Sequence, residues 1–458
     1  MRIGLGTPLT LSEIASALVA SAKKGFEDRI IEHLTTDTRE LFEGDLFLPL
    51  SSESCDAEQF VPDAIGKGAL AISKKEPSAH IKCSEDKEPL KELAKYYRKT
   101  KLCPKHTVAI TGSVGKTTTK EFLAAICKGF LKVHSTKGNF NNLIGVPLSI
   151  LSAPKETEML ILELGMNSLG EISELSKTAH PDIAVITKIG SAHIGRLGSR
   201  ENIAKAKLEI IDGMIGGTLI VPYGEPLLCG YPSVNFSAKE PLSDYYLCKN
   251  KDTFSAFYKG EIMFNFDFAP EGEQNLECLS AAVCAASTAG LDHEKIIEGI
   301  SLISDENIRQ RLVKTNGLYI LDDSYNASEE SIESAIKMVS GSSDHPRKSA
   351  VFGTVLELGE YSETIHERIG ALAASGDLFH LYFIGEGADA MARGALNRGF
   401  PPERLAVIGG TDYLRKAAEL IKSDSVKDEL ILIKGSHKLG LSGIISELEK
   451  IFGGTKNV

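Results

Sequence analysis

TGSVGKTTTK, at residues 111–120, is the stretch that decides the fold of this chain. It follows an apolar run at 107–110 and precedes a helix-like segment, EFLAAICKGF. A strand, a glycine turn, Lys-Thr and a helix N-terminus together hold nucleotide phosphates, because backbone N–H groups and the helix dipole point at the anion. Ile110 stands where the usual GxxxxGK[ST] spacing has glycine, so this is a shorter GxxGKT variant. We expect a phosphate-binding loop here rather than a glycine turn that opens an ordinary helix.

The side chains of this loop have separate predicted roles. Lys116 can reach the β- and γ-phosphates of a nucleotide, and the Thr117 hydroxyl can ligate Mg²⁺. The glycines allow the backbone N–H groups to point at the phosphate oxygens. The residues that we expect to contact the triphosphate are Gly112, Ser113, Val114, Gly115, Lys116, Thr117 and Thr118.

Composition and charge restrict the class of protein. A length of 458 residues predicts about three domains, and 42% hydrophobic with 25% charged residues is ordinary for a globular protein with packed cores. A formal net charge of −11 argues against a protein that binds nucleic acid by neutralising its phosphates. No apolar run reaches the roughly 18 residues of a membrane-spanning helix. The eight cysteines lack metal-type spacing, which favours reduced thiols and a cytoplasmic location.

The chain divides into three predicted α/β units. Residues 1–102 form a small N-terminal domain with short strands and helices. Residues 103–312 alternate apolar strands with helices, which indicates a parallel sheet covered on both faces. Residues 313–458 alternate in the same way and predict a Rossmann-like, doubly wound C-terminal domain.

Two local patterns add detail to this division. The N-terminal segment MRIGLGTPLTLSEIASALV is interpreted as a folded helix, with a capping box from Thr10 to Glu13. The alternating segment SAFYKGEIMFNFDF, at 255–268, suggests antiparallel strands, and the small-residue run at 275–290 suggests a helix.

Polar side chains at the ends of the central strands are candidates for the chemistry. Ligands of open α/β sheets gather at the carboxyl ends of strands. Glu163 ends the strand LILE beside the phosphate loop, where a carboxylate can hold Mg²⁺ directly or through water. His193 follows the next strand and Lys207 lies on a later helix, and each taken alone is compatible with an ordinary structural role. At least one of three nearby asparagines is expected to contact phosphate or substrate: Asn139, Asn141 or Asn142.

The third unit adds further candidates. Asp323 directly follows a predicted strand, where a carboxylate can accept both ribose hydroxyls. Asn326 and Ser328 could contact a ligand or cap the next helix. Arg311, at the domain boundary, could either stabilise a transferring phosphoryl group or form an interdomain salt bridge.

Taken together, these segments resemble the Mur ligase family, and within it the members that add D-alanyl-D-alanine. The resemblance covers nearly the whole chain, and its more specific parts are the FNN-IG-PL and ELG-S-H patterns. The segments that carry it are TTDTRELFEGDLFLPL, TGSVGKTTTKE, GNFNNLIGVPLSIL, ELGMNSLGEI, SAHIGRLGSRENIAKAKLEI, NLECLSAAVCAAS, RQRLVKTNGLYILDDSYNAS, FGTVLELGEYSETIHERIG and LIKGSHKLGLSGII.

The resemblance implies an ATP-dependent amide-bond ligase of the cytoplasm, acting in peptidoglycan precursor synthesis. Such an enzyme joins D-alanyl-D-alanine to UDP-N-acetylmuramoyl-tripeptide through an acyl phosphate and releases ADP and phosphate. The first domain would bind the UDP-sugar, the second ATP with two Mg²⁺ ions, and the third would close on ATP and bind the incoming dipeptide. A monomer without nucleic-acid partners or a membrane span is expected.

The resemblance also implies roles for individual residues. Lys116, Glu163, His193 and Lys207 would be catalytic, with Thr117, Glu163 and His193 as metal ligands. Lys207 falls where these ligases carry a carbamylated lysine, an anion that can bridge Mg²⁺ and that requires a lowered lysine pKa. Nucleotide contacts would come from Asn275, Arg311 and Asp323, and substrate contacts from Asp37, Thr38, Arg39, Asn139, Asn142, Asn167 and, for the dipeptide, Asn326.

Some positions depart from the family pattern, and other functions remain open. SSESCDAE stands at 51–58 where the family has a glycine, a basic residue and Asp-Gly-His, Gln274 replaces a histidine, and Thr354 replaces an aspartate. The nearest alternative is another Mur ligase that adds a different amino acid, such as the tripeptide-forming enzyme. A P-loop switch is disfavoured because no DxxG follows the loop and TKIG at 187–190 lacks the aspartate of a guanine-specifying NKxD. A non-catalytic nucleotide-binding scaffold would have no need of a second metal site.

Overall fold

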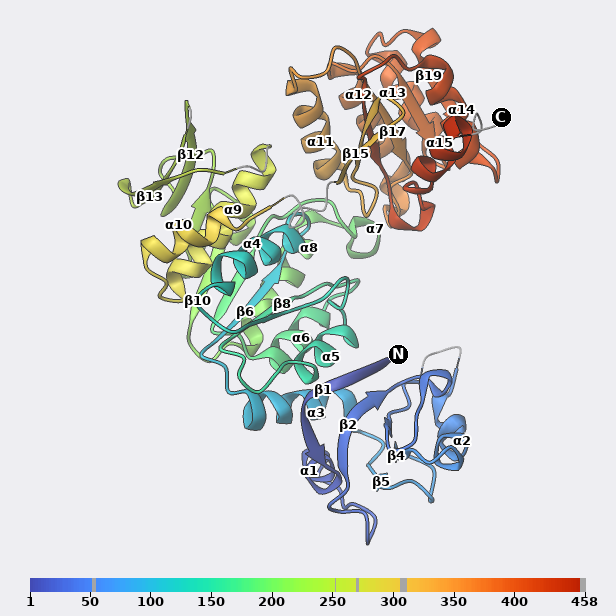
Figure 1. The fold of residues 1–458 in the computed structure, drawn as a ribbon. Coiled ribbons are helices and arrows are strands. Elements are labelled where there is room, and N and C mark those ends of the chain that lie inside the picture. The colour runs from blue at the N-terminus through green and yellow to red at the C-terminus, as the bar shows by residue number, and fades with distance from the viewer. Residues whose placement is uncertain (52–54, 252, 269–271, 305–310, 454–458) are drawn as a thin grey trace.

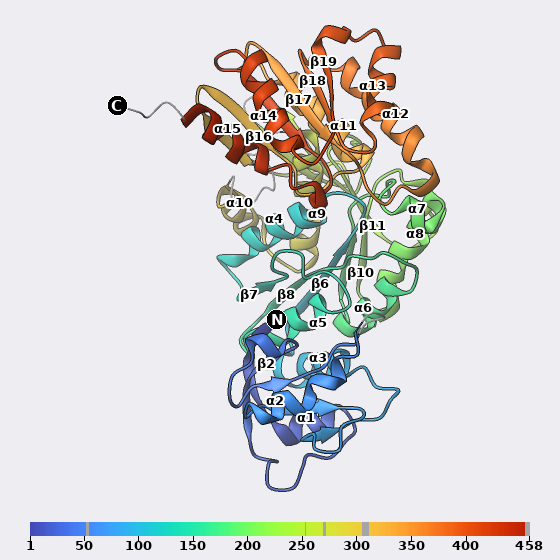
Figure 2. The same ribbon diagram turned by 90° about the vertical axis from the view of Figure 1, so that its right-hand side faces the viewer.

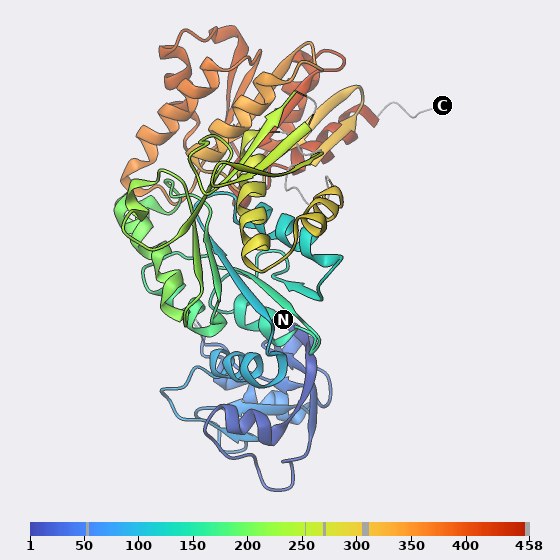
Figure 3. The same cartoon turned by 90° about the vertical axis from the view of Figure 1, so that its left-hand side faces the viewer.

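The computed structural model describes residues 1–51, 55–251, 253–268, 272–304 and 311–453. Strands of these residues form three sheets, of five, nine and six strands in chain order. The corresponding units follow one another along the long axis of the molecule in all three ribbon views (Figure 1, Figure 2 and Figure 3). The predicted three-domain α/β architecture is confirmed.

The N-terminal sheet has the order β1-β2-β3-β4-β5, with β1 antiparallel to β2 and the other neighbours parallel. The prediction of a single helix at the N-terminus was wrong for its first part, because Arg2–Thr10 forms β1. Apolar residues alternate along this segment, as expected of a half-buried strand. The predicted capping box does open the following helix: Glu13 N–H donates to Thr10 Oγ1 and Thr10 N–H donates to Glu13 Oε2. The elements are β1 (Arg2–Thr10), α1 (Leu11–Ala17), β2 (Ile30–Thr35), β3 (Leu46–Phe47), α2 (Val61–Gly66), β4 (Leu70–Ser73), β5 (Ile81–Lys82) and α3 (Pro89–Tyr97).

The middle sheet has the order β14-β13-β12-β11-β10-β9-β6-β8-β7, and β6, which leads into the phosphate loop, lies between β9 and β8. Strands β6 to β12 run parallel, whereas β13 is antiparallel to both β12 and β14, as the alternating pattern at 255–268 predicted. The elements are β6 (His106–Thr111), α4 (Lys116–Lys128), β7 (Val133–Ser135), α5 (Gly145–Leu151), β8 (Met159–Glu163), α6 (Glu171–Ala179), β9 (Ile183–Ile186), α7 (Ile194–Leu197), α8 (Arg200–Leu208), β10 (Thr218–Pro222), β11 (Val234–Ser237), β12 (Tyr245–Asn250), β13 (Thr253–Tyr258), β14 (Glu261–Phe266), α9 (Glu273–Thr288) and α10 (His293–Ser301).

The C-terminal sheet has the order β15-β16-β20-β17-β18-β19 and is parallel except for the edge strand β15. Its central strands are almost entirely buried, which agrees with a sheet covered by helices on both faces. The elements are β15 (Arg311–Thr315), β16 (Leu318–Asp322), α11 (Glu329–Gly341), β17 (Lys348–Gly353), α12 (Ser362–Ser375), β18 (Leu381–Ile384), α13 (Ala388–Asn397), β19 (Leu405–Ile408), α14 (Tyr413–Asp424), β20 (Leu430–Lys434) and α15 (Gly443–Gly453).

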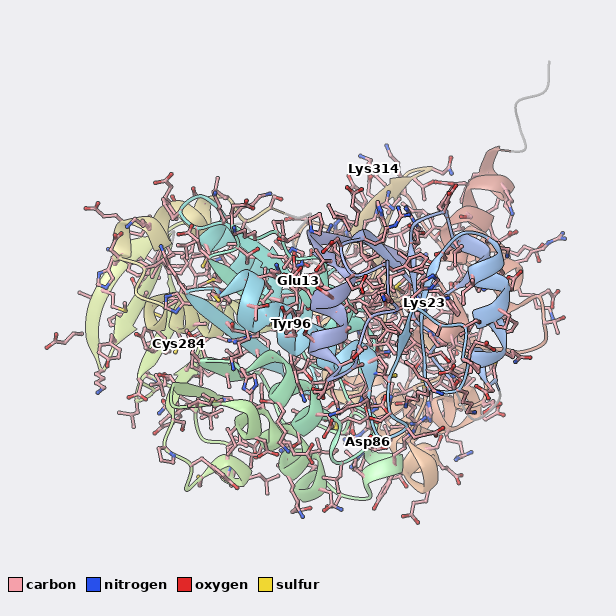
Figure 4. All side chains as sticks on the ribbon, turned by 90° about the horizontal axis from the view of Figure 1, so that it is seen from below. Glu13, Lys23, Asp86, Tyr96, Cys284 and Lys314 are labelled. Atoms are coloured by element: carbon pink, nitrogen blue, oxygen red, sulfur yellow. The ribbon has the colours of Figure 1, made fainter. Side chains whose placement is uncertain are left out.

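The N-terminal and middle domains share one hydrophobic core. It runs from residues of β1 and α1 through α3 to α5 and the central strands. The Tyr97 hydroxyl donates to Ala153 O at 2.8 Å, and an added Cβ on Gly6 would lie 2.0 Å from the same oxygen. Figure 4, which views the molecule from below, labels Glu13 on α1 and Tyr96 on α3, close together where these helices pack. The first two domains are therefore one packed body.

The C-terminal domain has its own cores on the two faces of its sheet. Ile194, the first residue of α7, packs against both the shared core and one of these cores. A separate core favours movement of this domain relative to the other two.

Candidate active site

Steric contacts explain the two glycines of the phosphate loop. Gly112 has φ +148°, and a Cβ at this position would lie 1.9 Å from Thr187 Oγ1. Gly115 has φ +88° and caps α4, and a Cβ here would lie 2.9 Å from the Cys278 Sγ atom. The Thr187 hydroxyl, just after the neighbouring strand β9, donates to Val114 O at 2.6 Å and so holds the loop in place. The predicted strand, loop and helix are thus present, with α4 beginning at Lys116.

A cleft opens in front of this loop, between the middle and C-terminal domains. Its middle-domain wall comes from the loop, the end of β8 and the start of α9, and its other wall comes from the end of β16, from α11 and from β20. It is lined by Ser113, Val114, Gly115, Lys116, Thr117, Thr118, Asn141, Glu163, Ala192, Gly272, Gln274, Asn275, Asp323, Tyr325, Asn326, Ala327, Ser328, Ser331, Ser334, Met338 and Lys434.

Glu163 and Thr117 meet at the base of the cleft. The Thr117 hydroxyl donates to Glu163 Oε2 at 2.6 Å, and the Asn141 amide donates to Glu163 Oε1 at 2.9 Å. Glu163 is 1% exposed, and both carboxylate oxygens accept a hydrogen bond, as a buried charge requires. The carboxylate and hydroxyl oxygens brought together here are donors that suit Mg²⁺.

Of the three predicted asparagines, Asn141 is the one that lines the cleft. Asn142 instead stabilises the turn before α5, because its Oδ1 accepts the N–H groups of Ile144 and Gly145 at 3.1 and 2.8 Å. Asn139 is exposed. The three lie within four residues of one another in the sequence, so only the turn of the chain distinguishes them.

Two lysines near the phosphate loop interact with each other electrostatically. Lys116 Nζ donates to Gly112 O at 2.7 Å. Lys207, on α8, is 2% exposed, and among the described residues its amine has no hydrogen-bond or ion-pair partner. Burial, reinforced by the positive charge of Lys116, lowers the pKa of Lys207 well below its usual value. The lowered pKa favours a neutral amine at Lys207.

His193 lies beside Ala192 of the cleft wall, in a left-handed conformation with φ 67° at the start of α7. Its Nδ1 lies 2.6 Å from Glu357 Oε2 of the C-terminal domain. Burial lowers the pKa of His193, and Lys116 and Lys207 lower it further, although Glu357 acts in the opposite direction. The imidazole therefore lies in the electrostatic field of both lysines.

The C-terminal wall contains a buried ion pair that the sequence analysis did not single out. Lys434 is 2% exposed, and its Nζ donates to Asp323 Oδ2 at 2.6 Å and to Asn326 O at 3.2 Å. The signal was present in the segment ELILIKG (429–435), where a lysine directly follows the apolar run that forms β20. Ser328 caps α11, as one of the predicted alternatives stated.

Several predicted contacts lie away from this cleft. Asn275 lines it, whereas Arg311 and Asn167 are exposed and are not among its lining residues. In the N-terminal domain, Asp37 pairs with Arg39 at 2.6 Å, and this guanidinium holds the pKa of the Asp37 carboxyl well below its usual range. Thr38 lies between them in a short 3-10 helix.

Two of the family departures can be placed. Thr354 is 5% exposed, and its hydroxyl donates to Ile384 O and accepts the N–H of Gly387, each at 3.3 Å, so it serves the C-terminal fold. Gln274 lines the cleft at the start of α9. Of the segment 51–58, residues 52–54 lie outside the described part of the chain.

The residues at the base of the cleft fit a magnesium ion better than a metal held by the protein alone. Among the described residues, no group of three or more His, Cys, Asp or Glu side chains is arranged as a metal site. Mg²⁺ is usually bound by one or two carboxylates together with substrate phosphates and water, which the Glu163–Thr117 pair can match. Within the described ranges, no helix is both long and apolar enough to cross a bilayer.

Comparisons with known proteins agree with this geometry. Residues 110–286 match the Mur ligase middle domain, and residues 308–437 match the Mur ligase, glutamate ligase domain. The chain is 34% identical to the UDP-N-acetylmuramoyl-tripeptide--D-alanyl-D-alanine ligase of Bacillus subtilis, over 96% of this chain and 98% of the relative.

Solved structures show the same likeness over almost the whole fold. MurF from Acinetobacter baumannii superposes with a TM-score of 0.87 at 27% identity, covering 98% of this chain and all of that chain. The MurF ligase from Thermotoga maritima, solved in complex with ADP, gives a TM-score of 0.79 at 26% identity and covers 92% and 98%. The chain therefore belongs to the Mur ligase family.

Proposed function

We propose that this chain is an ATP-dependent ligase that joins D-alanyl-D-alanine to UDP-N-acetylmuramoyl-tripeptide and releases ADP and phosphate. The observation that carries this proposal is the 34% identity to the Bacillus subtilis enzyme of that name, across nearly all of both chains. The cleft supports it, because a phosphate loop and a buried carboxylate face a second domain across one opening. The product would serve peptidoglycan precursor synthesis.

The first chemical step would be attack of the tripeptide carboxylate on the γ-phosphate of ATP, which forms an acyl phosphate and ADP. Two anions must approach each other, so positive charge at the loop is essential. Lys116 and the N-terminus of α4 supply it from the protein. The phosphate loop would hold the triphosphate through backbone N–H groups of residues 112–118.

Thr117 and Glu163 would hold Mg²⁺, with His193 as a further ligand. When bound, the two metal ions would neutralise charge on the triphosphate and on the acyl phosphate. Lys207 is suited to carbamylation, because a neutral buried amine can bond to CO₂ and release one proton, which leaves an anionic carbamate. In that form it would be a metal ligand as well.

The other walls of the cleft would bind the rest of ATP and the dipeptide. Asn275 would contact the nucleotide, and Asp323, held by Lys434, would accept the ribose hydroxyls. Arg311 would reach the nucleotide after movement of the C-terminal domain, since it does not line the cleft here. Asn326 would contact D-alanyl-D-alanine, whose amine attacks the acyl phosphate carbonyl and expels phosphate.

The UDP-sugar would bind at the N-terminal domain. Asp37, Thr38 and Arg39 would contact it there, and Asn139, Asn142 and Asn167 would contact it from the middle domain. Residues 1–102, 103–312 and 313–458 would thus serve the UDP-sugar, ATP and the dipeptide in turn. We further infer a cytoplasmic monomer, in agreement with eight free cysteines. Size-exclusion chromatography with light scattering tests the monomer.

One assay tests the proposed reaction. The purified chain is incubated with ATP, Mg²⁺ and UDP-N-acetylmuramoyl-tripeptide, and phosphate release is measured with and without D-alanyl-D-alanine. Release that depends on the dipeptide, with formation of the pentapeptide product, supports the proposal. Stimulation by a free amino acid acting on a shorter nucleotide peptide, and none by the dipeptide, would assign the chain to another Mur ligase reaction.

A further inference from the structure

The segment 191–198, which follows β9, touches the segment 357–361 of the C-terminal domain. We call these two segments together the interdomain contact. Gly195 N–H donates to Glu357 O at 3.1 Å, and the Tyr361 hydroxyl donates to Gly198 O at 2.8 Å. Ser191 N–H donates to Glu330 Oε1 of α11 at 2.6 Å, beside this contact. Polar contacts therefore hold the C-terminal domain against the loop that carries His193.

Backbone packing makes this contact specific. A Cβ on Gly195 would lie 2.3 Å from Gly359 N and 2.6 Å from Glu357 O, so only glycine allows the two segments to approach. Glu357 itself has φ 65°, a left-handed backbone conformation that few residues other than glycine adopt. Such a conformation persists only where the surrounding structure imposes it, and it commonly marks functional positions.

The Glu357 side chain is directed at His193. Its Oε2 lies 2.6 Å from His193 Nδ1, and its Oε1 lies 3.7 Å from Arg196 Nη2. A carboxylate accepts hydrogen bonds and cannot donate them, so the His193 nitrogen that faces it carries a proton. In the neutral ring, Nε2 is then the nitrogen with the free lone pair.

The loop that carries Glu357 is tied to the C-terminal wall of the cleft. Leu356 N–H donates to Ser436 Oγ at 2.9 Å, and Ser436 is two residues beyond the cleft residue Lys434. Val355 N–H donates to His366 Nε2 at 2.9 Å. The position of Glu357 is therefore coupled to the wall that would bind the nucleotide ribose.

We propose that Glu357 is a positioning residue for His193: across the gap between two domains, its carboxylate sets the ring tautomer that leaves Nε2 able to bind metal. The inference deepens the proposed function and rests on it. The N-terminal and middle domains share a core, whereas the C-terminal domain has its own. His193 would consequently be held in its working state only when the C-terminal domain is docked, so the metal site and domain docking are completed together.

Carboxylates that orient a metal-binding histidine in this way typically change metal affinity or activity by about 10- to 100-fold when they are removed. Glu357→Leu removes the acceptor and the charge, whereas Glu357→Gln removes the charge but keeps an acceptor oxygen. Glu360→Leu is the matched control, because Glu360 is exposed and lies three residues along the same loop. Loss in the leucine variant with retention in the glutamine variant identifies the hydrogen bond, not the charge, as the cause.

The first measurement is the tautomer of His193, from long-range ¹H–¹⁵N spectra of histidine-labelled protein with ADP and without Mg²⁺, because a metal on Nε2 would itself leave the proton on Nδ1. His193→Gln identifies its signal. We expect the Nδ1-protonated ring in the wild type, in Glu357→Gln and in Glu360→Leu, and loss of this preference in Glu357→Leu. Glu357→Ala serves the same purpose if the leucine variant does not fold. An unchanged tautomer in the variant without the acceptor would overturn the proposal.

The second measurement is the Mg²⁺ concentration that half-saturates ADP binding, by calorimetry, followed by kcat and KM. We expect a rise of about 10- to 100-fold in this concentration for Glu357→Leu and less than threefold for Glu357→Gln and Glu360→Leu. Equal effects of the leucine and glutamine substitutions would contradict positioning through a hydrogen bond. Neither the tautomer of His193 nor the Mg²⁺ dependence of ADP binding requires turnover. A wild type without ligase activity would therefore refute the proposed function and leave this test intact.

Discussion

Replacement of Gly115 by alanine tests the steric account of the phosphate loop. Gly115 has φ +88°, and a left-handed conformation costs an alanine about 1–2 kcal/mol. Its Cβ would also lie 2.9 Å from the buried Cys278 Sγ atom, and such overpacking costs about 1–3 kcal/mol more. We therefore expect Gly115→Ala to lower the free energy of unfolding by about 2–5 kcal/mol, or to displace the loop and abolish ADP binding.

Two further variants separate these contributions. Gly170 has φ +90° and caps α6, but nothing lies within 4 Å of a Cβ built there. Gly170→Ala should therefore cost only the conformational part, about 1–2 kcal/mol. Adding Cys278→Ala to Gly115→Ala removes the sulfur atom and should recover part of the overpacking cost.

Urea unfolding gives the free energies, and calorimetry gives the ADP affinity. If Gly115→Ala proves no worse than Gly170→Ala and binds ADP normally, the loop does not depend on this close approach. The free energy of unfolding of the double variant is corrected for the effect of Cys278→Ala alone. If it is then no higher than that of Gly115→Ala, the clash is not with the thiol.

Three further predictions follow from the site and its surroundings. Lys116→Ala should abolish ADP formation, because the charge that offsets the γ-phosphate is lost, while circular dichroism shows an intact fold; near-normal turnover would mean that the loop is misinterpreted. Lys207→Ala should lose activity that short carboxylic acids partly restore, since they can replace a carbamate; no rescue at any concentration argues against carbamylation. His366 Nε2 accepts the Val355 N–H, and burial lowers the pKa of His366 in the folded protein. The neutral imidazole therefore contributes to stability above the unfolded-state pKa of about 6.5, and this contribution is lost as pH falls through the lower pKa of the folded state. Between pH 7.5 and 5.5 the wild type should thus lose stability relative to His366→Gln, by at most about 1.4 kcal/mol per pH unit, and parallel pH profiles would refute this.

Much of the fold could be predicted because its signals are local. An apolar run followed by GxxGKT predicts a strand, a loop and a helix, and the structure places α4 at Lys116 as expected. The alternation at 255–268 predicted the antiparallel pair β13 and β14. The first strand was not predicted, because the capping box at Thr10 was interpreted as part of one helix over the whole N-terminal segment.

Sequence alone determined which residue types are available for phosphate and metal binding, since a glycine loop and a strand-end carboxylate are recognised by their neighbours in the chain. Only the tertiary structure decided which of three asparagines meets Glu163, that Lys434 pairs with Asp323, and that Glu357 faces His193. The physical reason is distance along the chain: these pairs are separated by 22, 111 and 164 residues. No periodicity or local propensity reports such contacts, because the first two form only when distant segments of one domain pack together and the third only when two domains meet.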